Sequence, residues 1–182
     1  MSKLRVPVTS EDHAQGPADA PVTLVEYGDY QCPHCGHAYP IVKQLQRRFG
    51  NKLRFVFRNF PLREVHPQAE EAAEAAEFAG AHGKFWEMHD AIFENQQSLG
   101  DRLFVQLAHA LKLDPEALAK SLRAGEFAER VQADFAGGAR SGVNGTPTFF
   151  INGQRHDADF ELEMLTAAVN EALPQKSRAA ER

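Results

Sequence analysis

Hydrophobic residues in the first third of the chain follow a strand–helix–strand order. Val22–Tyr27 is a nearly continuous run of β-favouring residues, which predicts a buried strand. From Pro33 onward, apolar residues recur at helical spacing up to Gly50, where we expect the helix to end. Apolar and charged residues then alternate over positions 52–58, which predicts a second strand.

The middle of the chain has helical spacing throughout. Between Pro67 and about Ala139, the apolar positions predict five helices. Pro67 suits a first helical turn, and Asp114-Pro115 is typical of the start of the fourth helix. Because a strand pattern returns after this stretch, we interpret it as a helical insertion into an α/β domain.

The last part of the chain returns to β structure. Thr148–Ile151 predicts a strand, Asn152-Gly153 a two-residue hairpin turn, and Gln154–His156 the short partner strand. A final helix is expected to reach Leu173. The chain therefore divides into an N-terminal arm (1–20), an α/β domain (21–65 and 140–173), the helical insertion (66–139) and a polar tail expected to be disordered (174–182).

Composition and charge narrow the class of protein. The chain has 182 residues, of which 43% are apolar, enough for one domain with a proper core. A net charge of −5 argues against a nucleic-acid surface. No apolar run follows the charged start at Met1–Arg5, and none is long enough to cross a bilayer. We expect a soluble cytoplasmic protein that binds neither nucleic acid nor membrane, or a periplasmic or secreted one if a leader was removed.

The two cysteines of the chain stand three residues apart in the motif Cys32-Pro33-His34-Cys35. Side chains at this spacing share one face of a helix, about 5–6 Å apart between Cβ atoms. A disulfide needs Cα atoms about 5.5 Å apart, so the pair can open and close with little backbone movement. Cytosolic disulfides are usually transient and catalytic. The motif therefore predicts a reversible dithiol.

The position of the motif predicts a division of labour between its sulfurs. Cys32 lies where the helix begins, and unpaired N–H groups there lower the pKa of a thiol. A His34 imidazolium would stabilise the thiolate further. Stabilising the reduced form makes a disulfide more oxidising, so Pro33-His34 predicts an easily reduced bond. We expect Cys32 to attack and Cys35, one turn deeper, to resolve.

The motif also has other interpretations. Two free cysteines placed three apart by chance would be inert. Cys32, His34, Cys35 and His37 crowd together, but structural zinc usually takes four ligands from two separated pairs, and there is no second cysteine pair. Covalent haem attachment needs histidine directly after the second cysteine, where Gly36 stands. We therefore expect no metal and no bound cofactor.

Two further segments carry candidate chemistry. Glu26 is an acid in an otherwise apolar strand. It is either an edge-strand residue facing water or a partly buried carboxylate under the dithiol, with a raised pKa, that relays protons for the deeper thiol. Thr146-Pro147 directly precedes a predicted strand, where proline is tolerated. An X–Pro bond in such a turn is either cis or an ordinary trans turn.

These motifs together resemble the DsbA-like thiol-disulfide oxidoreductases of the thioredoxin superfamily. The resemblance covers about residues 17–173 and implies a thioredoxin-like α/β fold with an all-helical insertion. It implies that Pro147 is cis beside the dithiol, that Thr146 offers backbone hydrogen bonds to an incoming peptide, and that Glu26 is a buried proton relay. It also implies that the insertion caps the active site and shapes a substrate groove. The matching motifs are Val25-Glu26-Tyr27, Cys32-Pro33-His34-Cys35, His66-Pro67, Gly83-Lys84-Phe85-Trp86 and Gly145-Thr146-Pro147-Thr148-Phe149.

The expected function is dithiol–disulfide exchange with protein substrates by a monomer or weak dimer. Its redox partner would be glutathione or another thiol-disulfide protein. One alternative is a glutathione-dependent isomerase or transferase of the same fold acting on small molecules; such enzymes usually have a single serine or cysteine, so Cys35 counts against it. The other alternative is a non-enzymatic metal-binding or chaperone-like module. The sequence leaves the net direction of exchange open.

Overall fold

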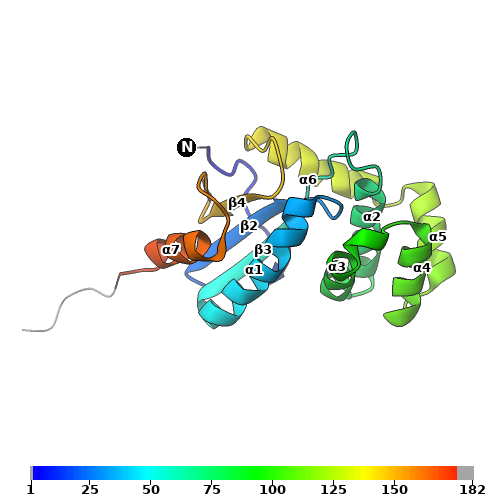
Figure 1. Ribbon diagram of the computed structural model, residues 1–182, viewed down its shortest axis with the longest axis horizontal. Helices are drawn as coiled ribbons and strands as arrows, with labels where there is room; N and C mark the ends of the chain where they lie inside the picture. The colour runs from blue at the N-terminus through cyan, green and yellow to red at the C-terminus, as the bar shows by residue number, and fades with distance from the viewer. Residues whose placement is uncertain (1, 176–182) are drawn as a thin grey trace, which may run out of the picture.

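The computed structural model describes residues 2–175, and its centre is a five-stranded mixed sheet (Figure 1). The strand order is β1-β3-β2-β4-β5, with β2 parallel to β3 and antiparallel to β4. This mixed sheet with a helical insertion confirms the predicted thioredoxin-like fold. The strands are β1 (His13–Gln15), β2 (Val22–Gly28), β3 (Leu53–Asn59), β4 (Thr148–Ile151) and β5 (Gln154–Arg155).

The predicted strand–helix–strand unit is β2, α1 (Pro33–Phe49) and β3. Proline stands at the first helical position of α1, where its missing N–H costs nothing. Gly50, with φ of 50°, ends the helix in a backbone region that favours glycine. Both ends of this helix are therefore set by residues at the ends themselves, Pro33 and Gly50.

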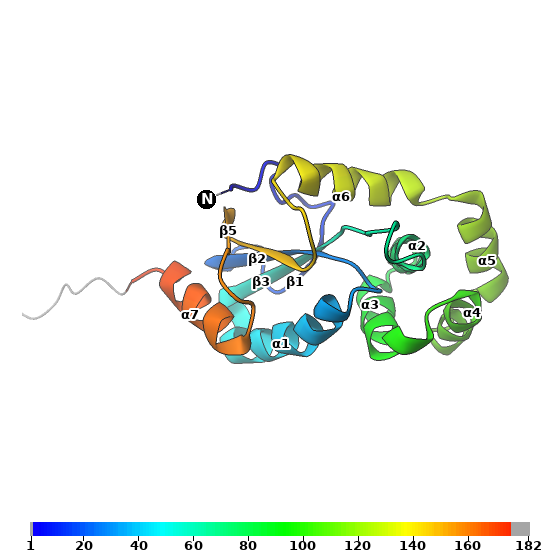
Figure 2. The ribbon, with the colours of Figure 1, turned by 45° about the horizontal axis from the view of Figure 1, so that its top comes forward.

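All five helices predicted for the insertion are present. In the described structure they gather at one end of the sheet, except that α6 runs back across the sheet face opposite α1 (Figure 2). The Asp114 carboxylate caps α5 by accepting the N–H groups of Glu116 and Ala117 at 2.9 and 3.2 Å. The helices are α2 (Ala69–Ala81), α3 (Phe85–Glu94), α4 (Asp101–Ala110), α5 (Pro115–Ala124) and α6 (Ala128–Arg140), with the short 3₁₀ helix η2 (Gln96–Ser98) between α3 and α4.

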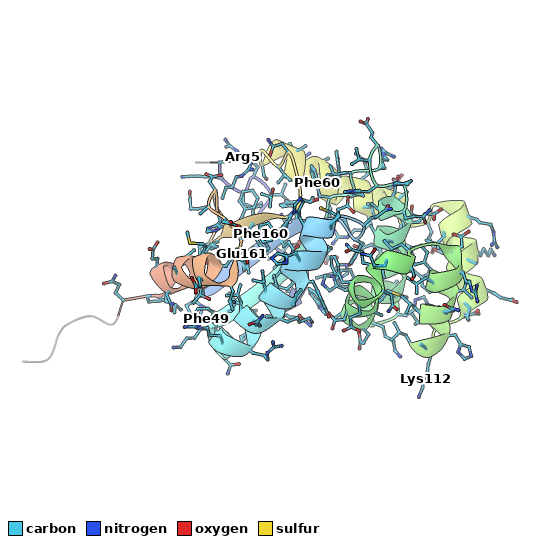
Figure 3. The ribbon with its side chains drawn as sticks, viewed as in Figure 1. Arg5, Phe49, Phe60, Lys112, Phe160 and Glu161 are labelled. Atoms are coloured by element: carbon cyan, nitrogen blue, oxygen red, sulfur yellow. The ribbon has the colours of Figure 1, made fainter. Side chains whose placement is uncertain are left out.

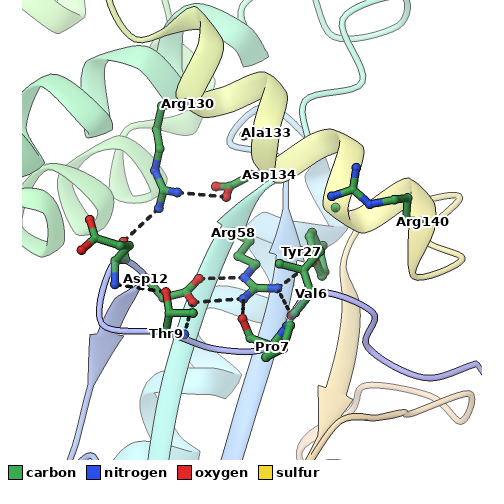
Figure 4. A pocket seen from close by; sticks show the side chains of 12 residues that line it. Val6, Pro7, Thr9, Asp12, Tyr27, Arg58, Arg130, Ala133, Asp134 and Arg140 are labelled. Atoms are coloured by element: carbon green, nitrogen blue, oxygen red, sulfur yellow. Dashed lines mark hydrogen bonds and ion pairs between the residues drawn. The ribbon is translucent and has the colours of Figure 1, made fainter.

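The N-terminal arm contributes an edge strand that the sequence analysis did not foresee. Strand β1 pairs antiparallel with β3, and a three-residue strand is too short to show a hydrophobic period. The arm is tied down by Arg58, which donates to the Asp12 carboxylate at 2.7 and 3.0 Å and to the carbonyls of Val6 and Pro7 (Figure 4). These contacts line a cavity of about 200 Å³ between the arm and α6.

Alternation along β2 sends its side chains into two separate cores. Val22 and Leu24 belong to the larger core, which also holds both cysteines and the apolar face of α1. Val25 and Tyr27 belong to a smaller core on the other face of the sheet. Successive strand residues point to opposite faces, so Glu26 shares the α1 face with Leu24.

The C-terminal end of the described chain is α7 (Leu162–Ala172), which packs beside α1 and β4. The predicted disordered tail lies, from residue 176 onward, outside the described residues. Among residues 2–175, every helix falls short of the length and apolarity that crossing a membrane requires.

Candidate active site

The dithiol lies at the turn between β2 and α1, as the sequence predicts. Cys32 has an extended backbone with φ of −66° and ψ of 123° and immediately precedes Pro33, the first residue of the helix. No disulfide joins the two cysteines in this structure. Cys35 is fully buried and Cys32 exposes 3% of its surface, so a partner can reach only Cys32.

The two sulfurs have opposite acidities. A hydrogen bond from the Cys35 thiol lowers the pKa of Cys32 to about 5, helped by Thr146 and by the N–H groups of Cys35 and His34 and opposed by burial. Burial raises the pKa of Cys35 well above its ordinary value, although the Asp29 N–H donates to its sulfur at 3.4 Å. At neutral pH the pair therefore holds one thiolate, on Cys32, and one thiol, on Cys35.

The imidazole of His34 is exposed, and the contribution of this residue to the low pKa of Cys32 comes from its backbone N–H. The predicted electrostatic effect of a protonated His34 side chain stays a prediction.

Glu26 lies in the centre of the sheet. It stands opposite Phe57 of β3 and Phe149 of β4 and is 3% exposed. The alternative of an edge-strand residue facing water is therefore wrong. Burial, followed by the charge of the Cys32 thiolate, raises the pKa of Glu26 to about 8. A carboxyl group in this state holds its proton at neutral pH, on the same face of the sheet as the dithiol.

The loop before β4 closes the other side of the site. Cys32 Sγ lies 3.4 Å from the Thr146 carbonyl oxygen, to which its protonated form, but not the thiolate, can donate. The Thr146–Pro147 peptide bond is cis. This loop is the part of the α/β domain in direct contact with the reactive sulfur.

Asp29 is a site residue that the sequence analysis did not identify. Its side chain is completely buried. One carboxylate oxygen accepts the N–H groups of Gln31 and Cys32 at 2.8 and 3.2 Å. The other accepts the Leu62 N–H at 2.9 Å and contacts His66 Nδ1 at 2.8 Å. The available signal was an Asx turn, in which an aspartate binds the backbone two residues on.

Gln96, in η2, is the second residue missed. Its side-chain amide donates to the carbonyl oxygens of Tyr30 and Cys32 at 2.9 and 2.8 Å. No local pattern distinguishes it from the neighbouring Gln97, which is exposed. The contact joins segments more than 60 residues apart, so only the tertiary structure reveals it.

An aromatic cluster in the insertion supports the same turn. The Tyr30 hydroxyl lies 2.9 Å from His89 Nδ1, and its ring is 4.9 Å from that of Phe93 and 5.2 Å from that of Phe57. Burial lowers the pKa of His89 well below its ordinary value, so its imidazole is neutral at neutral pH. Helix α3 of the insertion therefore packs directly against Tyr30, two residues before Cys32.

The histidines near the dithiol do not converge with it. His34 and His37 are exposed, and His37 Nε2 lies 3.0 Å from a carboxylate oxygen of Glu161, which Figure 3 shows beside α1 next to Phe160. Among residues 2–175, no three His, Cys, Asp or Glu side chains gather closely enough to hold a metal ion.

Comparisons with known proteins agree with the observed thioredoxin-like fold. A family model described as thioredoxin matches residues 8–171. The fold is similar to that of oxidised BdbD from Bacillus subtilis, with a TM-score of 0.85 and 26% identity over 94% of this chain and 97% of that one. It is also similar to a thioredoxin-like oxidoreductase from Silicibacter pomeroyi, with a TM-score of 0.76 and 28% identity over 90% and 93% of the two chains.

Curated sequences similar to this chain are segments of longer proteins. A stretch of Na⁺/H⁺ antiporter NhaA 1 from Salinispora arenicola is 47% identical over 171 residues, which is 93% of this chain and 26% of that protein. The chain thus spans about a quarter of the length of the curated relatives it matches.

Proposed function

This chain belongs to the DsbA-like thioredoxin family and carries its CxxC pair, and we propose that it exchanges disulfides with protein substrates through Cys32 and Cys35. One observation carries most weight: a single buried pair combines a thiol of pKa about 5 with one whose pKa is raised well above its ordinary value. In such a pair, at neutral pH, the attacking sulfur is a thiolate and the resolving sulfur is still a protonated thiol.

The proposed reduction of a substrate proceeds in two exchanges. The Cys32 thiolate attacks one sulfur of the substrate disulfide, forming a mixed disulfide and releasing the other substrate sulfur as a thiolate. Cys35 then loses its proton and attacks the Cys32 sulfur, which releases the substrate as a dithiol and leaves the Cys32–Cys35 disulfide. Two electrons pass from the protein to the substrate, and the reverse sequence oxidises a substrate dithiol.

Two residues are proposed to assist these steps. In the mixed disulfide Cys32 carries no charge, so one of the two causes that raise the pKa of Glu26 is removed. The ionised fraction of Glu26 then takes the Cys35 proton during resolution, a role supported by its burial on the dithiol face. The backbone of Thr146, beside Pro147, binds an extended segment of the substrate by strand addition, a role supported by the contact between the Thr146 carbonyl and Cys32.

The net direction is set by the redox partner and the compartment. We propose glutathione or another thiol-disulfide protein as partner. In the cytoplasm, which the sequence leads us to propose, the glutathione pool would keep the dithiol reduced, and the protein would reduce its substrates. In an oxidising compartment the same sulfurs would donate their disulfide.

The test is a trapping experiment with Cys35→Ser. Serine keeps a hydroxyl that can donate to Cys32, so the attacking thiolate is preserved while resolution is lost. This variant should accumulate mixed disulfides with an added disulfide protein such as insulin, and the double variant Cys32→Ser/Cys35→Ser should accumulate none. Turnover of glutathione conjugates without any protein adduct would favour the isomerase or transferase alternative. Function that survives loss of Cys35 would favour the metal-binding or chaperone-like one.

The curated relatives support a second candidate function, in which this domain is one part of a longer Na⁺/H⁺ antiporter polypeptide. The observation is the 47% identity with a segment of a protein of that name. An antibody raised against residues 8–171 should then detect, in membranes of the source cells, a polypeptide far longer than 182 residues. A single soluble polypeptide of the size of this chain would contradict the candidate.

A further inference from the structure

The backbone turn that presents Cys32 is held from the helical insertion by one side-chain amide. Gln96 Nε2 donates at 2.9 Å to the carbonyl of Tyr30 and at 2.8 Å to the carbonyl of Cys32. Both hydrogens of the amide group are used on this turn. The donor comes from η2, in the insertion, whereas the acceptors belong to the α/β domain.

The carbonyl of Cys32 is a particularly informative place for this contact. The Cys32 N–H is already bound by the Asp29 carboxylate at 3.2 Å. The following peptide has no N–H, since Pro33 supplies its nitrogen. That peptide can therefore be held only through its oxygen, which accepts the Gly36 N–H at 3.0 Å and the Gln96 amide. Asp29 and Gln96 thus fix Cys32 from its two neighbouring peptide groups.

Gly36, directly after the second cysteine, provides the space that Gln96 occupies. A Cβ atom at position 36 would lie 2.3 Å from Gln96 Oε1 and 3.0 Å from Gln96 Cδ. Such distances force the glutamine to move, and movement of its amide would break the two hydrogen bonds. The glycine is required here for space, because its φ does not lie in the left-handed region.

We propose that Gln96 is a positioning residue for thiol–disulfide exchange: it holds the turn from Tyr30 to Cys32 at the start of α1 and links the reactivity of Cys32 to the seating of the helical insertion. This proposal rests on the proposed function. The electrostatic reason is that a carbonyl oxygen near a thiolate repels its charge, and an N–H donor on that oxygen reduces the repulsion. The geometric reason is that the helix N–H groups stabilise the thiolate only when Cys32 stays in place.

The test compares Gln96→Ala with Gln97→Ala, which removes the same side chain from an exposed neighbouring position. The pKa of Cys32 is measured from the ultraviolet absorbance of the thiolate as a function of pH. The equilibrium between the Cys32–Cys35 dithiol and its disulfide is measured in glutathione buffers. A typical net hydrogen bond corresponds to roughly one pKa unit. Gln96→Ala should therefore raise the pKa of Cys32 by about 0.5–1 unit and make the disulfide about 3- to 10-fold less oxidising. Gln97→Ala should match the wild type.

Gly36→Ala gives an independent measurement. In the wild-type background it should raise the pKa of Cys32 in the same direction, because the new methyl group displaces the amide. In the Gln96→Ala background it should have little further effect, because there is no amide left to displace. Equal effects of Gly36→Ala in both backgrounds would overturn the proposal.

The two hypotheses fail in different ways. The pKa and the glutathione equilibrium need no protein substrate, so absence of protein exchange would refute the proposed function and leave this inference standing. A Gln96→Ala protein that is less stable but whose Cys32 titrates as in the wild type would refute the inference, because Gln96 would then be only structural.

Discussion

Replacing Glu26 by glutamine tests the burial of the carboxyl group and its role in exchange. The pKa of Glu26 is raised from an ordinary 4.5 to about 8, with burial as the largest cause. Between these two values the folded protein holds a proton on this group and the unfolded chain does not. Stability therefore falls as the pH rises through this window, because the unfolded state binds fewer protons. Glutamine cannot ionise, so Glu26→Gln should lack this loss.

The size of the effect follows from the distance between the working pH and the ordinary pKa. At pH 7 that distance is about 2.5 units, and at 1.36 kcal/mol per unit the wild type should lose about 3 kcal/mol relative to the variant between pH 4.5 and pH 7. The comparison across pH cancels the constant cost of burying an amide. Both proteins keep Cys32 and Cys35, whose titration contributes to both curves.

The assay is urea denaturation of the reduced proteins at several pH values from 4.5 to 8. A difference in unfolding free energy that stays constant over this range would refute the reasoning about Glu26. The exchange rate with a disulfide protein is measured on the same samples. Glu26→Gln should slow the resolving step, and unchanged rates at every pH would remove the proposed relay role while leaving the burial result intact.

Three further predictions concern contacts at the site and in the helical insertion. Cys35→Ala should raise the pKa of Cys32 by at least about one unit, because it removes the strongest hydrogen bond to the thiolate, whereas Cys35→Ser should raise it less; equal alkylation profiles for the two variants would contradict this. Asp29→Ala should lower the unfolding free energy by about 3–5 kcal/mol, since it removes a buried carboxylate with four hydrogen-bond partners, and a loss below about 1 kcal/mol in urea denaturation would count against it. Asp114→Ala should cost about 1 kcal/mol by removing the cap of α5, with exchange rates unchanged; a slower exchange would show that the far end of the insertion affects the dithiol.

Most elements of this fold follow from contacts within a few residues. Pro33 and Gly50 mark the ends of α1, and Asp114 marks the start of α5, because helix ends need local partners for their unpaired backbone groups. The spacing of Cys32 and Cys35 on one helical face is likewise local. These features were correctly predicted because the residues that cause them are neighbours in the chain.

Other features depend on residues that meet only after folding. Arg58 looked like a polar strand residue, yet it is buried because Asp12 and two carbonyls of the arm reach it. The sequence alone left two environments open for Glu26, and the pairing of β2 between β3 and β4 selected the buried one.

By itself the sequence determined a reactive dithiol at the start of a helix, a sheet interrupted by five helices, and a proline before the strand that returns. Tertiary structure decided how far the pKa of each sulfur is shifted and which distant groups hold Cys32 in place. The physical reason is that pKa values and turn geometry depend on burial and on hydrogen bonds from distant segments, such as those of Thr146 and Gln96. Periodicity and spacing do not record which of these distant groups will become neighbours.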